Sequence, residues 1–136
     1  MAQECPLSVP LTIKDTQDGF AGETGTVWTI APDCSYTVAR QIALKTLDPH
    51  KHGRLTSEQQ GQLRELLSRV AAAGLPKQLG AATQVNARRI SMSYAGKDSV
   101  LTLAPGADAV AAARVSHDSA GALLDLADQV KGMTGG

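Results

Sequence analysis

Apolar and polar side chains alternate near the start of the chain, and this alternation limits the fold more than any other feature of the sequence. Val9, Leu11 and Ile13 are separated by single residues that are proline or polar, which is the period of a strand with one buried face. Residues 24–30 are rich in the β-forming residues threonine, valine, tryptophan and isoleucine. Because a turn-rich segment, 15–23, separates these two stretches, they predict a β-hairpin.

The same period returns twice further along the chain. Alternation over residues 36–44 predicts a third strand, which extends to residue 47 at most, and Asp48 to Arg54 is expected to be a loop. Residues 77–87 are also expected to be a loop. Residues 88–94 and 99–103 flank a turn and predict a second hairpin.

Two other segments have the 3.6-residue period of amphipathic helices. Thr56 and Gln59 have the spacing of a capping box at the start of the first helix, and Gly74 ends it. The second helix begins at Asp118 or Ser119, and residues 105–115 fit either a loop or a weak helix. The expected apolar stripes are Leu63, Leu66, Leu67, Val70 and Ala71 in the first helix, and Ala120, Leu123, Leu124, Ala127 and Val130 in the second.

The order of these elements predicts the fold class. Three strands, a helix, two strands and a helix favour an α+β two-layer sandwich, with an antiparallel sheet of about five strands and two helices packed on one face. A length of 136 residues fits one domain. We assign that domain to residues 9–131, with an N-terminal segment at 1–8 and a flexible tail at 132–136.

The charge balance bears on the class of partner. Thirteen basic residues balance thirteen acidic ones, which argues against nucleic acid or an anionic membrane as the main partner. No apolar run approaches the ~20 residues that a membrane span needs, so no membrane insertion is expected. We expect a monomer that interacts with another protein.

The two cysteines bear on the location of the protein. Cys5 and Cys34 are an even pair without the spacing of a redox or zinc motif, and in an exported protein they predict a disulfide. The first residues have the character of a mature N-terminus from which a leader was removed, so we expect a periplasmic or secreted protein. Two unpaired thiols in a cytosolic protein are the alternative.

Candidate catalytic and metal-binding groups are few. His50 and His52 could chelate a metal on a strand, but their neighbours indicate an exposed loop. Asp15, Asp18 and Glu23 surround a turn without the spacing of a calcium loop. No serine lies in a nucleophile motif. We therefore expect no metal, no cofactor and no enzymatic activity; a hydrolase whose site is assembled from distant residues is the alternative.

The turn of the first hairpin contains the only phenylalanine of the chain. Its sequence is Asp18-Gly19-Phe20-Ala21-Gly22. Turns use glycine because glycine accepts positive φ angles, but they do not need a large apolar ring. Phe20 is therefore either a plug that folds back onto the core or an exposed anchor for a partner.

The stretch from Leu11 through Gly19-Phe20-Ala21-Gly22 to the Thr-Val-Trp-Thr-Ile strand resembles the opening of the emfourin-like family. These small bacterial proteins are typified by the protealysin inhibitor, which acts on thermolysin-like metalloproteases. The family begins with a strand, a Gly-Gly-Phe-Ala-Gly turn and a return strand, and continues with a leucine-rich helix, a hairpin and a final helix. The resemblance covers residues 9–131 in element order, with Asp18 in place of the first glycine of the turn.

The resemblance implies a non-enzymatic protein-binding domain of the bacterial envelope or exterior. The turn residues 18–22 would contact the partner, which would be a secreted metalloprotease. The alternative function is a structural or surface-exposed envelope protein without inhibitory activity.

Overall fold

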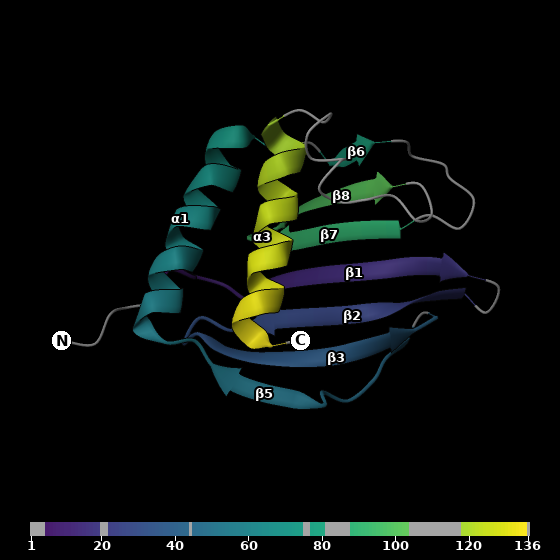
Figure 1. The fold of residues 1–136 in the computed structure, drawn as a ribbon, viewed down its shortest axis with the longest axis horizontal. Helices are drawn as coiled ribbons and strands as arrows, with labels where there is room; N and C mark the ends of the chain where they lie inside the picture. Colours follow the sequence, from purple (N-terminus) through teal and green to yellow (C-terminus); the bar gives the residue numbers. More distant parts are fainter. Residues whose placement is uncertain are drawn as a thin grey trace.

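A β-sheet carries two helices on one of its faces (Figure 1). The computed structural model describes residues 5–19, 22–43, 45–74, 77–80, 88–103 and 118–135. The strands are β1 (Leu11–Gly19), β2 (Gly22–Ile30), β3 (Ser35–Ile42), β4 (Lys45–Thr46), β5 (Lys51–Arg54), β6 (Gln78–Gly80), β7 (Arg88–Tyr94) and β8 (Lys97–Leu103). The helices are α1 (Ser57–Ala73) and α3 (Asp118–Thr134). The expected α+β fold is thereby confirmed.

The strand order is β4-β3-β2-β1-β7-β8-β6, and β5 also pairs with β3. The first hairpin is in register from Leu11 opposite Ile30 to Gly19 opposite Gly22. β1 also pairs with β7, so the two predicted hairpins lie side by side at the centre of the sheet. These pairs are antiparallel, whereas β6 joins β8 in parallel.

Two short strands, β5 and β6, lie in segments that were expected to be loops, and the third strand, expected to extend to residue 47 at most, ends at Ile42, so that Lys45–Thr46 forms a separate strand, β4. Lys51–Arg54, predicted as part of a loop, is β5 and pairs with β3 along residues 35–38. β4 and β6 likewise lie at the ends of the sheet order. Short edge strands of this kind are held by backbone hydrogen bonds and have no apolar face, so the alternation of apolar and polar residues does not predict them. At β5, Gly53 lies opposite Tyr36, and a β-carbon at this glycine would meet the tyrosine ring.

The last helix is longer than the sequence indicated. α3 runs to Thr134, so the interpretation of residues 132–136 as a flexible tail is corrected for its first three residues. Thr134 is only 1% exposed, and its hydroxyl donates a hydrogen bond to the Val130 carbonyl at 2.9 Å. Burial against the rest of the fold therefore stabilises a helical end that glycine composition alone disfavours. Residues 105–115 lie outside the described part of the chain.

The predicted capping box of α1 is present. The Thr56 hydroxyl accepts a hydrogen bond from the Gln59 backbone N–H at 3.1 Å, and the Gln59 side chain accepts one from the Thr56 N–H at 2.9 Å. Gly74 follows the helix with a φ of 62°. Neither α1 nor α3 is long and apolar enough to span a membrane.

The core lies between the helices and one end of the sheet. The strands contribute Leu11, Ile13, Trp28, Ile30, Val38, Ile90, Met92 and Leu101, α1 contributes Leu63, Leu66 and Val70, and α3 contributes Leu123, Leu124, Leu126, Ala127 and Val130. In the predicted stripe of α1, Leu67 is only half-buried and Ala71 is exposed.

The helices do not cover the whole length of the strands. Figure 1 shows that β1 and β2 continue well past α3 toward their connecting turn. Alternate residues of a strand share a face, and on the helix-facing side of β1 the sequence changes from Leu11 and Ile13 to Asp15 and Gln17. We call the apolar part of the sheet beneath the helices the covered end, and the part from Asp15 to the hairpin turn, with its neighbouring strands, the open end.

Candidate functional site at the open end of the sheet

The predicted binding residues lie at the tip of the first hairpin, as far as the structure describes them. Asp18 and Gly19 end β1, and Gly22 begins β2 with a φ of 101°, a conformation that favours glycine. Phe20 and Ala21 lie outside the described residues.

The base of this tip is braced by an ion network. Asp18 and Glu23 lie directly opposite each other, an arrangement that would be destabilising for two carboxylates alone. Arg89 of β7 relieves it, because its guanidinium lies 2.5 Å from the Asp18 carboxylate and 3.4 Å from the Glu23 carboxylate. Gln41 of β3 donates a further hydrogen bond to Glu23 at 2.8 Å. Four neighbouring strands are thus tied together just below the turn.

A second arginine forms an ion pair on the opposite face of the sheet. Arg88 donates two hydrogen bonds to the Asp15 carboxylate, at 3.0 and 2.7 Å. These hydrogen bonds raise the pKa of Arg88, although burial opposes them. In the same way, hydrogen bonding to Asp18 raises the pKa of Arg89. Both arginines are held as permanent cations in these pairs.

The candidate metal ligands are not brought together. Asp15 faces the helix side of the sheet, whereas Asp18 and Glu23 face the other side. His50 lines a pocket on the helix side, whereas His52 of β5 lies opposite Thr37, on the other face. Among the described residues, no group of three histidine, cysteine or acidic side chains could hold a metal ion.

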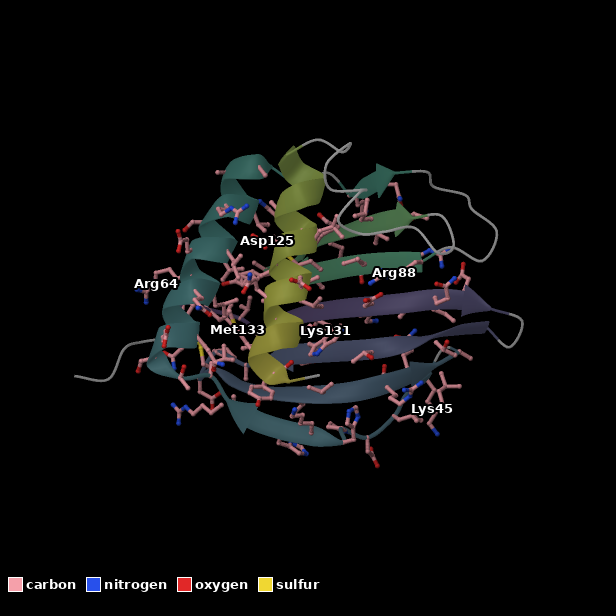
Figure 2. All side chains as sticks on the ribbon, viewed as in Figure 1. Lys45, Arg64, Arg88, Asp125, Lys131 and Met133 are labelled. Carbon is pink, nitrogen blue, oxygen red and sulfur yellow. A yellow bond between two sulfur atoms is a disulfide. The ribbon has the colours of Figure 1, made fainter. Side chains whose placement is uncertain are left out.

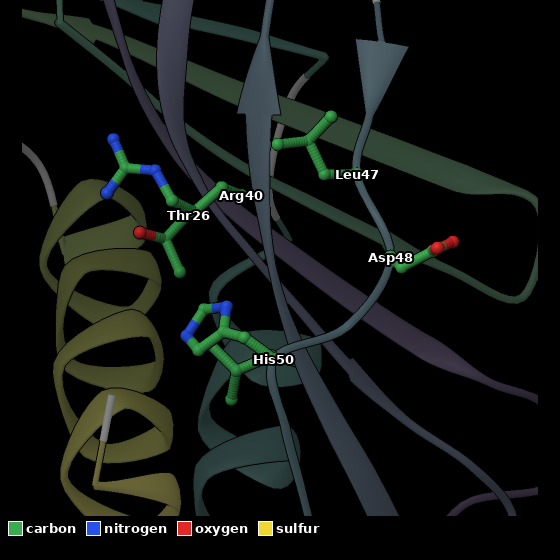
Figure 3. A pocket seen from close by; sticks show the side chains of 6 residues that line it. Thr26, Arg40, Leu47, Asp48 and His50 are labelled. Atoms are coloured by element: carbon green, nitrogen blue, oxygen red, sulfur yellow. The ribbon is translucent and has the colours of Figure 1, made fainter.

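A pocket of about 280 Å³ opens beside β3 on the helix side of the open end (Figure 3). Figure 3 shows the Arg40 guanidinium, the Thr26 hydroxyl and the His50 ring on one side of the strand, with the Asp48 carboxylate pointing away from them. The lining residues are Thr26, Val38, Arg40, Leu47, Asp48 and His50. The pocket can therefore present hydrogen-bond donors and positive charge to a ligand.

Exposed apolar side chains border this pocket. Ile42 is 46% exposed and Leu47 is 36% exposed. Ile42 ends β3 and pairs with Thr24, so it lies close to the hairpin tip. Val9, which is 36% exposed, precedes β1 and therefore lies at the opposite end of the sheet.

A smaller cavity of about 70 Å³ lies where α3 meets the sheet. Trp28, Asp15 and Arg88 contribute to its walls, together with Asp128 and Lys131 of α3. The Nε1 atom of Trp28 is buried and has no hydrogen-bond partner within the described part of the chain. The cavity is too small for a drug-sized ligand, and Asp15 and Arg88 are engaged with each other, so we do not assign a catalytic site to it.

The predicted cysteine pair lies at the covered end. Cys5 and Cys34 form a disulfide with a Cα–Cα separation of 5.6 Å, visible as a yellow bond in Figure 2. Cys34 is fully buried in the turn between β2 and β3 and has a φ of 64°. The bond joins the N-terminal segment to that turn and is compatible with an oxidising location outside the cytoplasm.

A scan of protein-family models and a search of curated proteins find no match to this chain.

Sequence reasoning missed several residues of the open end. Arg40 and Ile42 were assigned to a strand without any functional role, and His50 was assigned to an exposed loop. Their common surface depends on how far the helices extend over the sheet, which no local pattern encodes. One available signal was the change from apolar to polar residues at alternate positions of β1 and β2.

Proposed function

We propose that this chain is a non-enzymatic protein-binding domain that uses the open end of its sheet, and that it inhibits thermolysin-like metalloproteases. The similarity of residues 18–22 to the emfourin-like turn supports the choice of target. The observation that carries the proposal is the braced hairpin tip, with Arg89 between Asp18 and Glu23 and exposed Ile42 beside it.

The physical reason is preorganisation. A binding segment that is already held in place loses less conformational entropy when a partner binds. The ion network holds the ends of β1 and β2, while the glycines on either side of Phe20 let a partner approach the backbone closely. An apolar ring at such a tip is the type of side chain that anchors interfaces.

The disulfide agrees with a role outside the cytoplasm, where secreted metalloproteases act. We therefore place the domain in the bacterial periplasm or exterior, as a monomer that binds its target directly.

Inhibition of thermolysin by the full chain tests the proposal. We expect the wild-type protein to slow cleavage of a peptide substrate, and Phe20→Ala to weaken the inhibition by a factor of ten or more, at a cost of about 2 kcal/mol for a hot-spot residue. Val9→Ala is the matched control, because Val9 is an exposed apolar residue at the other end of the sheet. It should inhibit like the wild type.

The proposal fails if the wild-type chain neither binds nor inhibits thermolysin or any related protease of the host bacterium. A structural role in the envelope would then be the better interpretation. If the wild type inhibits but Phe20→Ala inhibits equally well, the ring is not the anchor.

A further inference from the structure

Arg40 differs from Arg88 and Arg89, the other arginines of the open end, because it has no acidic partner among the residues that the structure describes. We propose that the pocket at Arg40 binds a carboxylate-bearing segment of the partner protein, in which acidic residues are flanked by apolar ones. This inference rests on the proposed protein-binding function and specifies which type of peptide segment the partner would contribute.

The contrast between arginines carries the argument. Arg69, Arg88 and Arg89 each bind a carboxylate of another strand or helix. Arg40 forms no ion pair and no side-chain hydrogen bond with the part of the chain that the structure describes. An arginine presents a planar set of N–H donors that matches a carboxylate in two parallel hydrogen bonds. Arg40 is therefore available to an external acid.

The side chains around Arg40 add hydrogen-bond donors and positive charge to the pocket. Thr26 lies opposite Arg40 in the register and contributes a hydroxyl to the same pocket. His50 is held beside β3 because its backbone N–H donates to the Val38 carbonyl at 3.0 Å. Lys45 pairs with Ile42 at the same end and adds a further positive charge (Figure 2).

The nearest acidic groups do not compete for this site. The Asp15 carboxylate already accepts both hydrogen bonds of Arg88. Asp48 is the one carboxylate among the residues that line the pocket, and Figure 3 shows it turned away from Arg40. A carboxylate from another molecule would therefore complement the charge of the pocket.

Apolar side chains beside the pocket point to a peptide rather than to a free anion. The Leu47 N–H donates to the Arg40 carbonyl at 2.8 Å, which places this partly exposed leucine directly next to the arginine. Ile42 lies further along the same strand and is more exposed. A segment with an acid between apolar residues would pair its carboxylate with Arg40 and cover both apolar side chains.

Titration of the ¹⁵N-labelled full chain, followed by NMR, tests this inference. The probes are three blocked peptides that differ only at their centre: Leu-Asp-Asp-Leu, its neutral counterpart Leu-Asn-Asn-Leu and its basic counterpart Leu-Lys-Lys-Leu. We expect the acidic peptide to shift the amide signals of residues 38–48, and the neutral and basic peptides to bind about tenfold more weakly or not at all.

Matched variants locate the site. Arg40→Gln should weaken binding of the acidic peptide about tenfold. Arg54→Gln is the control, because Arg54 is also an exposed arginine on a neighbouring strand but faces the other side of the sheet. It should bind like the wild type. Leu47→Ser should weaken binding of the acidic peptide but not binding of acetate, because acetate has a carboxylate and no flanking apolar residues.

Several results would overturn the inference: no shifts with the acidic peptide, equal shifts with the basic peptide, or equal losses in Arg40→Gln and Arg54→Gln. Acetate binding as tightly as the peptide would also overturn it, since the pocket would then be an anion site. The protease is absent from this experiment, so peptide binding without thermolysin inhibition would refute the proposed target while leaving the acidic partner intact.

Discussion

The covered end and the open end of the sheet are built from the same strands but differ in burial and in the residues that they carry. The helix-facing side of β1 carries the buried Leu11 and Ile13 at the covered end, and the partly exposed Asp15 and Gln17 at the open end. β3 changes in the same way from Val38 to Arg40. One strand can therefore line the core over part of its length and carry polar and exposed side chains over the rest, depending on where the helices stop.

The two ends also differ in the interactions that stabilise them. Burial of apolar side chains and a disulfide stabilise the covered end, whereas partly exposed ion pairs organise the open end. Apolar burial contributes far more free energy than partly exposed ion pairs do. Substitutions at the open end should therefore change the free energy of unfolding less than substitutions at the covered end.

The largest contrast should come from matched apolar truncations. Leu63→Ala removes a fully buried side chain from the core of the covered end and should lower the free energy of unfolding by about 2 to 5 kcal/mol. Ile42→Ala at the open end should change it by no more than about 0.5 kcal/mol. Urea denaturation followed by tryptophan fluorescence measures both, and equal effects would abolish the distinction between the two ends.

Removal of the disulfide comes next. The double substitution of Cys5 and Cys34 by alanine should lower the free energy of unfolding by about 2 to 4 kcal/mol, because the unfolded chain regains the freedom of a closed loop. Urea denaturation of this variant and of the oxidised wild type gives the difference. The hairpin tip lies at the far end of the sheet, so thermolysin inhibition by the folded variant should persist. Loss of inhibition in folded protein would show that the two ends are coupled.

A smaller and local effect is expected at the ion network. Arg89→Gln removes the cation between Asp18 and Glu23 and should cost about 0.5 to 1 kcal/mol, since the pairs are partly exposed. Amide hydrogen exchange should accelerate in Gln17 and Thr24, close to the tip, with little change at Ile13. A uniform acceleration through the core would mean that the network supports the whole fold.

The smallest effect is a change in titration at the covered end. The Ser35 hydroxyl and backbone N–H donate to the Asp33 carboxylate at 2.6 and 2.9 Å and lower the pKa of Asp33. The stability contributed by a lowered pKa is present above the pKa of the unfolded state, ~3.9, and is lost as the pH falls through the lower folded-state value. Ser35→Ala should raise the pKa of Asp33 toward its ordinary value in a ¹³C NMR titration of the carboxyl group. An unchanged pKa would mean that the hydroxyl does not hold the carboxylate.

Local patterns predicted much of the fold. The alternation around the first turn predicted the β1–β2 hairpin, which the register confirms. The Thr56 and Gln59 spacing predicted the start of α1, and the cysteine count predicted the disulfide. The strand period and the capping box could be predicted because they depend on residues close together in the sequence. The disulfide could be predicted because the chain has only two cysteines.

Other features could not be predicted in this way. β5 has a polar sequence and exists because β3 offers its backbone for pairing. The end of α3 at Thr134 depends on burial of this threonine, which lies in a glycine-rich stretch between Gly132 and Gly135. Both are decided by contacts between distant parts of the chain, which propensity does not describe.

The sequence by itself determined the order of the main strands and helices, the sides of each that face the core, and the glycine-bracketed turn with its single phenylalanine. The tertiary structure alone decided that the helices stop short of that turn and leave Arg40, Ile42 and Leu47 exposed on the sheet. The physical reason is that periodicity specifies which face of a strand is apolar, whereas the extent to which a helix covers that face depends on packing between elements far apart in sequence.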